Sequence, residues 1–256
     1  MEPVICFGQQ PNGFFPKRFL YSKFVTARRL QSEIGGRIIF FYHDSDHDYR
    51  ETVTPLMNRQ TGEEVRLNFE QENKLQKKYS PLYLKRIPKG WQERMVRKLP
   101  QYLDRSLVDL FASVQAITAS DFCLTMYEKL GLLEGIEIVR SSDPDFRDRT
   151  SELDTDYFAD VEYEGEIVRA QLKDGSLVLH RGGSEYLTLP EQELTKRQMN
   201  PDAHHRFAWM QSALHCTHYV MGAGEKSYLD LDAIHDVEMI ERDTVEHDHN
   251  SWLPNL

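Results

Sequence analysis

The chain has 256 residues, of which 40% are hydrophobic, so it can bury a sizeable core in one large domain or two small ones. Its net charge of -10 argues against a general nucleic-acid binder and favours a protein that handles small molecules. Three widely spaced cysteines fit reduced thiols better than a disulfide framework, and since the sequence has neither a signal-peptide pattern nor an apolar run of membrane-spanning length, we expect a cytoplasmic protein with no membrane partner.

The first predicted unit is a strand, a helix and a second strand. The apolar run Val4 to Gly8 predicts a buried strand that ends at a glycine turn, and "RIIFFYHDSDHDY" predicts a second strand that ends in a polar loop. Between them, residues 17–36 have a helical repeat of apolar side chains, with Pro16 at the start and two glycines at the end. A crossover this short should join two parallel strands in a right-handed unit.

The rest of the chain is predicted to contain an insertion, a meander and two more strands. Residues 52–129 have amphipathic and polar patterns that are typical of helices, which predicts a helical insertion. Strands are expected in the stretches 135–146 and 216–230, each followed by a polar or glycine loop, and residues 163–189 alternate around two glycine turns, as in a small β-meander. Residues 147–160 are predicted to be a charged linker and the last twelve residues a surface tail.

These elements predict an α/β fold with a Rossmann-like parallel sheet. We expect a single domain over residues 1–256, with a discontinuous core of residues 1–51 and 130–256 around the insertion 52–129. Four strands end in loops of ligand-binding type, "GQQPNG", "DSDHD", "SSDPD" and "GAGE". Ligands bind at the carboxyl ends of the strands in such sheets, so these loops should line one cleft.

The glutamine loop is predicted to hold an anionic or nucleotide group. Its glycines allow close backbone approach, and the helix that begins near Pro16 should point free N–H groups at the loop. The adjacent glutamines can donate to and accept from an uncharged polar group. The loop is neither a dinucleotide fingerprint nor a Walker A motif, and a solvated glycine turn is the alternative. The predicted cofactor-binding residues of this loop are Gly8, Gln9, Gln10, Asn12 and Gly13.

The stretch "HDSDHD" invites a metal hypothesis, but strand alternation prevents all its side chains from converging. We therefore predict no metal site here. An acid/base or ribose-binding role is the better hypothesis for Asp46, His47 and Asp48, with a hydrated strand end as the alternative.

A basic segment, residues 73–98, carries nine Lys or Arg and interleaved aromatic residues, which is typical of a nucleic-acid surface. In a chain this acidic we favour a solvated helical segment whose basic side chains pair with acidic residues elsewhere. Cys216 lies at the start of an apolar strand and is predicted to be a core residue in preference to a nucleophile.

Taken together, these residues resemble the bacillithiol biosynthesis cysteine-adding enzyme family. The loop Gly8-Gln9-Gln10, then Phe14 and Lys23, is similar to the family's "TGQQ" loop, its "GLF" and a helix lysine. Other similar parts, in chain order, are Asp46-His47-Asp48-Tyr49 with Glu51, the strand Gly135 to Asp145, Asn200-Pro201-Asp202 with Arg206, and Tyr219-Val220 with Gly222, Gly224, Glu225 and Tyr228. The resemblance runs through nearly the whole chain.

The resemblance implies a nucleotidyltransferase-type core and a ligase that joins cysteine to the amine of an amino-sugar conjugate, glucosaminyl malate. ATP with magnesium is the cofactor it implies, with Lys23 among the residues that bind it. Arg206 is expected to neutralise a carboxylate or phosphate, and Glu225, beside Gly222, Gly224 and Tyr228, to bind an amine.

The chain departs from the family in places. Lys17-Arg18 replace Gly-Pro, Ala223 replaces the usual Pro, and Ser45 replaces Glu. The family's coiled-coil dimerisation segment has no counterpart, so we expect a monomer or a dimer with a different interface. Two alternatives to a cysteine ligase stay open: an enzyme of this fold that acts on another amine or carboxylate, and a non-catalytic module that binds a metabolite or RNA.

Overall fold

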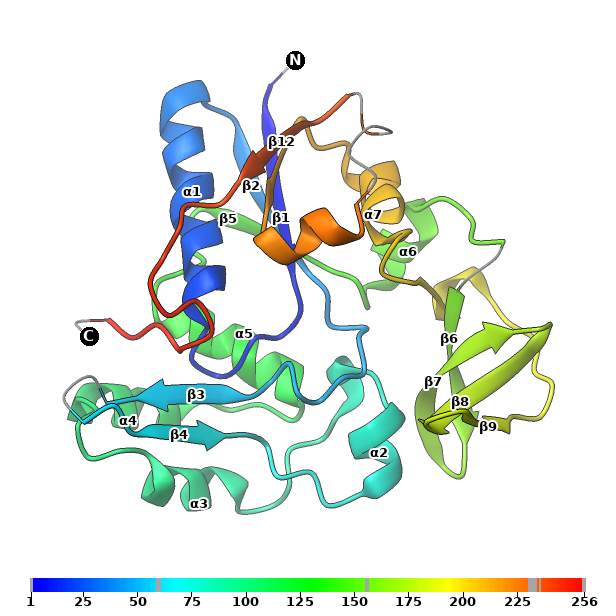
Figure 1. Cartoon of the computed structure of the whole chain (residues 1–256), viewed down its shortest axis with the longest axis horizontal. Coiled ribbons are helices and arrows are strands. Elements are labelled where there is room, and N and C mark those ends of the chain that lie inside the picture. The colour runs from blue at the N-terminus through cyan, green and yellow to red at the C-terminus, as the bar shows by residue number, and fades with distance from the viewer. Residues whose placement is uncertain (1, 59–60, 155–156, 230–233, 235, 255–256) are drawn as a thin grey trace.

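A five-stranded parallel sheet forms the centre of the molecule (Figure 1). The computed structural model describes residues 2–58, 61–154, 157–229, 234 and 236–254. The strands lie side by side in the order β12-β11-β1-β2-β5, and every pair is parallel. Their bounds are β1 Val4–Gln9, β2 Arg37–Tyr42, β5 Ile136–Arg140, β11 His218–Met221 and β12 Glu238–Glu241. The predicted α/β class is confirmed.

The predicted strand-helix-strand unit at the N-terminus is present. Helix α1 (Arg18–Ile34) connects β1 to β2, which pair in parallel over their whole length. Its apolar stripe packs against Ile5 and Phe7 of β1, while Cys6, which points to the opposite face, packs under helix α7 (Arg206–Leu214). Just after the helix, Gly36 has a φ of 88°. Its Cα lies so close to the Pro3 carbonyl that no side chain would fit there.

The strand order places a reversal between β1 and β11. In chain order the five parallel strands occupy positions 3-2-1-4-5, which is the order of a doubly wound sheet. Strand β12 was missed by the sequence patterns because its four residues begin and end with an exposed glutamate. Helices cover both faces of the sheet, α1 and α5 (Ala119–Lys129) on one and α6 (Pro144–Arg149) and α7 on the other.

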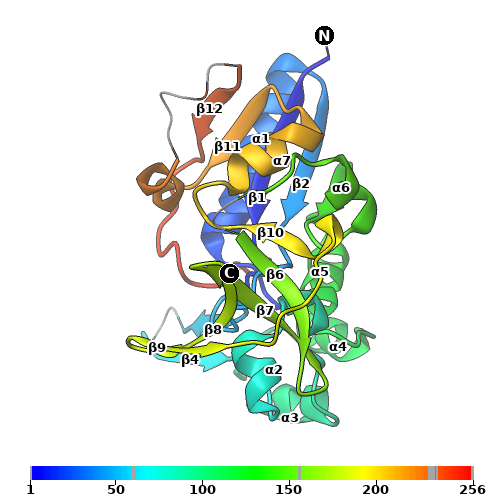
Figure 2. The same ribbon diagram turned by 90° about the vertical axis from the view of Figure 1, so that its right-hand side faces the viewer.

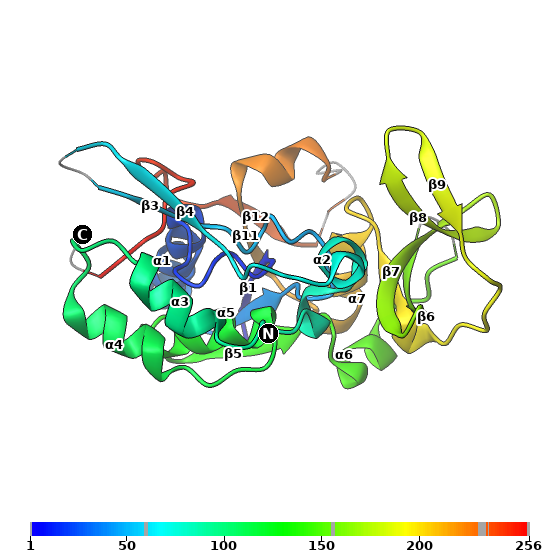
Figure 3. The same ribbon diagram turned by 90° about the horizontal axis from the view of Figure 1, so that it is seen from below.

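The insertion is not wholly helical, as had been predicted for residues 52–129. It opens with an antiparallel hairpin of β3 (Thr54–Met57) and β4 (Glu64–Leu67), whose strands are too short to show alternation. Four helices and a short 3-10 helix follow: α2 Lys74–Tyr79, η1 Leu82–Leu84, α3 Trp91–Lys98, α4 Arg105–Ser113 and α5. Trp91 and Phe111 pack edge-to-face against Phe14, which joins the insertion to the core. Figure 3 shows this part from below.

A second sheet, antiparallel, packs beside the core. Its order is β10-β6-β7-β8-β9, with bounds β6 Tyr157–Tyr163, β7 Glu166–Lys173, β8 Ser176–Gly182, β9 Glu185–Thr188 and β10 Met199–Pro201. Figure 2 shows it from the side nearest this sheet. The meander predicted for residues 163–189 is confirmed by β7, β8 and β9, whereas β6 lies mostly in the stretch that was predicted to be a linker. The predicted linker 147–160 is wrong in part: Arg147 ends up buried in α6 and donates to Asp160 (3.2 Å) and Asn200 (2.8 Å), so this stretch ties the two sheets together.

The C-terminal segment is packed and not the surface tail that was predicted. Ser251 and Leu253 are buried, and the Trp252 ring stacks on Tyr21 of α1 with the ring centroids 4.2 Å apart. The backbone amides of Ser251 and Trp252 also donate to the carbonyls of Pro55 in β3 and of Pro16 before α1. Among the described residues, no helix is both long and apolar enough to cross a membrane.

Candidate functional site

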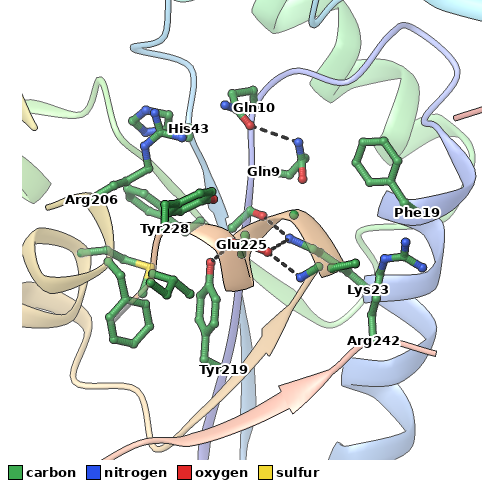
Figure 4. Close-up of a pocket in the computed structure, with 18 of the residues that line it drawn as sticks. Gln9, Gln10, Phe19, Lys23, His43, Arg206, Tyr219, Glu225, Tyr228 and Arg242 are labelled. Carbon is green, nitrogen blue, oxygen red and sulfur yellow. Dashed lines mark hydrogen bonds and ion pairs between the residues drawn. The ribbon is translucent and has the colours of Figure 1, made fainter. Parts of the chain in front are cut away.

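A cavity of about 410 Å³ lies at the carboxyl ends of β1 and β11, at the point where the strand order reverses (Figure 4). Ligands of doubly wound sheets bind at this position. The residues that line the cavity include Gly8, Gln9, Gln10, Lys23, His43, Arg206, Gly222, Gly224, Glu225 and Tyr228.

The two glutamines face this first cavity, as predicted. The Gln9 amide donates to Gln10 Oε1 (3.0 Å), and the Gln10 amide donates to Asp46 Oδ2 (3.2 Å). Gly8 gives the close approach: a Cβ there would lie 3.0 Å from the Tyr219 hydroxyl. Strand β1 therefore delivers a polar amide pair to the edge of the cavity.

Asn12 and Gly13, which were predicted to bind a cofactor, lie outside the cavity. Both are buried, and the Tyr127 hydroxyl accepts from the Asn12 amide (2.9 Å) and donates to the Gly13 carbonyl (2.7 Å). Gly13 has a φ of 81°, and a Cβ on it would lie 2.7 Å from Thr54 Oγ1. This half of the loop is a tight structural turn.

The start of α1 does not present free N–H groups to a ligand. The helix begins at Arg18, and the amides of Arg18 and Phe19 donate to the carbonyls of Asn250 (2.8 Å) and Asp248 (3.1 Å). The C-terminal segment thus satisfies amides that a helix start leaves open. The predicted anion site at this helix end is wrong, because the protein's own backbone occupies it.

Glu225 has a protein cation beside it in place of the predicted substrate ammonium. The Lys23 Nζ atom lies 2.6 Å from Glu225 Oε2 and also donates to the Gly8 carbonyl (2.8 Å). Glu225 further accepts from the Tyr219 hydroxyl (2.8 Å) and the Gly222 amide (2.6 Å). Figure 4 shows these contacts converging on the floor of the cavity. Lys23 is 2% exposed, so this ion pair is buried.

His43 is a residue of the cavity that was predicted only as part of the "HDSDHD" stretch, with no binding role of its own. It follows β2 directly and is 1% exposed, and neither ring nitrogen has a hydrogen-bond partner among the described residues. Burial lowers the pKa of His43 well below its ordinary value, and the nearby Arg206 and Arg169 guanidinium groups lower it further. The ring is therefore neutral and has an unused donor and acceptor.

Arg206, at the first position of α7, lies next to His43 in Figure 4. Within the described part of the chain its guanidinium makes one charged contact, at 3.6 Å to Asp46 Oδ2, and its Nε atom has no partner. Most buried or half-buried arginines are saturated by carboxylates or carbonyls. Arg206 and His43 thus offer a ligand neighbouring polar groups that have no partner among the described residues.

Tyr228 lines the first cavity from the end of the turn that carries Glu225. Burial raises its pKa to about 12, and the Glu225 carboxylate adds to the shift. Its hydroxyl is therefore neutral and can donate to a ligand.

The three predicted catalytic residues do not share this cavity. Asp46, His47 and Asp48 line a neighbouring cavity of about 560 Å³, and Arg206 lines both. Burial alone would raise the pKa of Asp46, but Arg169 and Arg206 outweigh it and hold this pKa well below its ordinary value. Burial, and then Arg169, lower the pKa of His47 to about 4. The prediction of one cleft is thus correct for the glutamine and glycine loops and wrong for Asp46 to Asp48.

The remaining acidic residue of that loop has a structural role. Asp44 is fully buried and accepts from Arg140 Nε (2.7 Å) and from the Ser142 amide (3.0 Å), which ties β2 to β5. Among the residues that the structure describes, no group of three His, Cys, Asp or Glu side chains could hold a metal ion.

The basic segment 73–98 is paired in part within the protein. Arg86 lies 2.5 Å from Glu166, and Arg94 and Lys98 both contact Glu70. Lys85 is buried and donates to two backbone carbonyls of α2. These contacts agree with a folded segment whose charges are balanced by acidic residues elsewhere.

Searches for related proteins leave the geometry as the basis for any function. No protein-family model matches the chain, and no curated protein matches it. The resemblance to the cysteine-adding family stays a prediction from the motifs.

Proposed function

We propose that the protein is a carbon-nitrogen ligase of the nucleotidyltransferase type of Rossmann-like fold, which joins an amine to a carboxylate in the first cavity. The observation that carries this proposal is the pair of a neutral, unpartnered His43 and a half-used Arg206 at the reversal point of the sheet. Cysteine as the carboxylate and an amino-sugar conjugate as the amine are the substrates suggested by the sequence motifs.

The proposed chemistry needs one anion binder and one proton acceptor. ATP, with magnesium, supplies the activation that a carboxylate needs before an amine can displace a leaving group. Arg206 is suited to hold the anionic group, because a guanidinium binds carboxylate or phosphate oxygens in a bidentate manner. His43 would be placed to take the proton that the attacking amine loses, because its ring is neutral and an anion bound at Arg206 would offset the positive charge that lowers its pKa.

The other residues of the first cavity would select and orient the ligand. Gln9, Gln10 and Tyr228 offer neutral polar groups, and the aromatic side chains of Phe19, Phe41 and Phe207 add apolar surface. Such a mixture suits a ligand with a polar chain and a flat apolar part, such as a nucleotide. The Lys23–Glu225 pair fixes the glycine turn, so Glu225 now has a positioning role in the proposal.

Calorimetric titration of the wild-type protein with ATP tests this proposal. We expect binding, and we expect Arg206→Gln to weaken it by about thirtyfold, the loss of one charge-assisted contact worth about 2 kcal/mol. Arg197→Gln is the matched control, because Arg197 is exposed and pairs with Asp148 far from the cavity. Formation of AMP or ADP in the presence of cysteine and an amino sugar would identify the reaction. A wild-type protein that binds neither ATP nor cysteine contradicts the proposal.

An enzyme of this fold that uses another amine or carboxylate is tested in the same assay by changing the substrates. A non-catalytic RNA-binding module is less well supported, since Arg86, Arg94 and Lys98 are paired with acidic residues and Lys85 is buried.

A further inference from the structure

The second cavity, of about 560 Å³, lies between the core and the antiparallel sheet. One wall is the loop 46–51 that follows β2, and the others come from α2 and from strands β6, β7 and β8. Its size is within the range of small-molecule sites. Arg206 lines this cavity and the first one, so the two spaces meet at its guanidinium.

Arg169 of β7 is a buried cation of this cavity without a carboxylate partner. It is 4% exposed, and its guanidinium donates to the carbonyls of Ser45 and Pro201 while its face lies 4.7 Å from the Phe158 ring centroid. No ion pair joins it to a described residue, and its Nε atom has no partner. Burial lowers the pKa of Arg169 to about 10, so it stays charged at neutral pH. Buried charges without a counter-charge are costly, which favours an anion nearby.

The acidic residues of the cavity offset these cations only in part. Asp46, whose lowered pKa keeps it ionised, has its Oδ2 atom 3.6 Å from the Arg206 guanidinium. The Asp48 carboxylate already forms an ion pair with Arg50, whose guanidinium nitrogen lies 2.6 Å from Asp48 Oδ2. Asp46 already accepts from the amides of His47 (2.6 Å) and Asp48 (3.1 Å) and from Gln10. Glu51 is the acid that is left, and burial raises its pKa.

The cations that are left are more numerous. Arg169, Arg206 and Lys78 line the cavity, and Lys78 bonds to the Arg181 carbonyl and to no described carboxylate. Three cations therefore face two carboxylates, Asp46 and Glu51, which leaves the cavity with an excess of positive charge.

We propose that the second cavity binds an anionic co-substrate, one that carries a carboxylate or phosphate group, through Arg169, Arg206 and Lys78. This inference rests on the proposed function, because the co-substrate would meet the activated group of the first cavity at Arg206. It names the chemical class of the second reactant: an acidic molecule and not a plain amine.

Gln171→Glu tests the proposal without touching either the core or the first cavity. Gln171 is exposed, lies on β7 and lines only the second cavity, so the variant should fold and add a negative charge there. Ser176→Glu, at an exposed position at the start of β8 outside both cavities, is the control with the same net charge. Calorimetry with citrate and with inorganic phosphate, at constant ionic strength, gives the two arms of the experiment.

We expect one of the two anions to bind the wild-type protein and the Ser176→Glu control equally, and to bind Gln171→Glu about tenfold more weakly. Stronger binding of citrate would indicate a carboxylate co-substrate, and stronger binding of phosphate a phosphorylated one. ATP should bind all three proteins alike. The proposal is overturned if neither anion binds the wild-type protein, or if both glutamate variants bind equally. Anion binding that depends on residue 171 in a protein that does not bind ATP would remove the ligase proposal and leave the anion site standing.

Discussion

At the scale of single residues, the first cavity combines saturated and unsaturated polar groups. Lys23 and Glu225 use their hydrogen-bonding capacity on each other and on the backbone, whereas both ring nitrogens of His43 and the Nε atom of Arg206 have no partner among the described residues. Saturated groups hold the shape of a site, and unsaturated ones are available to a ligand. The division explains why Glu225, the most prominent acid of the sequence motif, is not the group that receives a substrate.

Breaking the Lys23–Glu225 pair should destabilise the protein. We expect Glu225→Gln to lower the free energy of unfolding by about 3 kcal/mol, because it leaves the Lys23 ammonium buried without its counter-charge. The measurement is urea unfolding. The double variant Lys23→Met/Glu225→Gln should be more stable than Glu225→Gln alone, since it removes the orphaned charge as well. A single variant as stable as the wild type would mean that Glu225 is free for a ligand after all.

His43 should make the stability of the protein depend on pH in one direction. Its pKa is depressed in the folded state by burial and by Arg206, so below about pH 6.5 the unfolded chain binds a proton that the folded protein does not. The free energy of unfolding should therefore fall on acidification, by about 1.4 kcal/mol per pH unit from this residue alone.

Urea unfolding of the wild type and of His43→Gln between neutral and mildly acidic pH measures this slope. The variant should lose stability less steeply. His47, whose pKa is also lowered, to about 4, contributes in the same direction, and His47→Gln serves as the comparison that separates the two rings. Parallel pH profiles for the wild type and His43→Gln would show that His43 is protonated in the folded protein.

At the scale of elements, long periodic segments were predictable and short or tertiary features were not. The strands β1 and β2, helix α1 and the meander β7 to β9 follow from apolar spacing and glycine turns alone. The hairpin β3-β4 and strand β12 have four residues each, which is too few for alternation to show. The C-terminal segment has no period of its own, because its order comes from the amides of α1 and the ring of Tyr21.

The part of the site that lies at the ends of predicted strands could be predicted from the sequence. Gln9, Gln10, Gly222 and Gly224 come together because parallel strands end at one edge of the sheet. The sequence pattern of a glycine turn is the same whether the turn faces a ligand or the core. Asn12 and Gly13 were therefore wrongly predicted to bind a cofactor. The sequence also gave no sign that the loop after β2 turns away, which sends His43 into one cavity and Asp46 to Asp48 into the other.

The turn at Gly13 should depend on glycine for packing and not for binding. We expect Gly13→Ala to lower the free energy of unfolding by about 3 kcal/mol, because a Cβ would lie within 3.0 Å of the Thr54, Phe15 and Val53 oxygens at a positive φ. Gly131→Ala is the matched control: its φ is 73° with open space around it, so it should cost about 1 kcal/mol. Gly13→Ala protein that remains folded should bind ATP as the wild type does. Equal costs at the two positions would refute the packing argument.

At the scale of the whole molecule, three layers meet around the start of α7. Figures 1 and 2 show the parallel sheet, the insertion and the antiparallel sheet surrounding the region where β1, β2 and β11 end. The first cavity belongs to the parallel sheet, and the second lies where the antiparallel sheet packs on the core. Arg206 stands at the boundary, on the helix that follows β10 and precedes β11. The antiparallel sheet therefore forms part of the second cavity, because it supplies Arg169 and one of the cavity walls.

This arrangement predicts that anions in the two cavities influence each other through one guanidinium. An anion in the first cavity and another in the second share Arg206 and repel each other, so each should weaken the other's binding by about threefold to tenfold. By thermodynamic linkage the factor must be the same whether ATP is titrated into protein saturated with citrate or the reverse. Calorimetry in both orders measures it, with phosphate used in place of citrate if that is the anion that binds. Arg206→Met should weaken both ligands and also bring the factor towards one, whereas Arg197→Gln should leave both affinities and the factor unchanged. Independent binding in the wild type would mean that the guanidinium serves only one of the cavities, and that the two ligands do not meet at a common reaction centre.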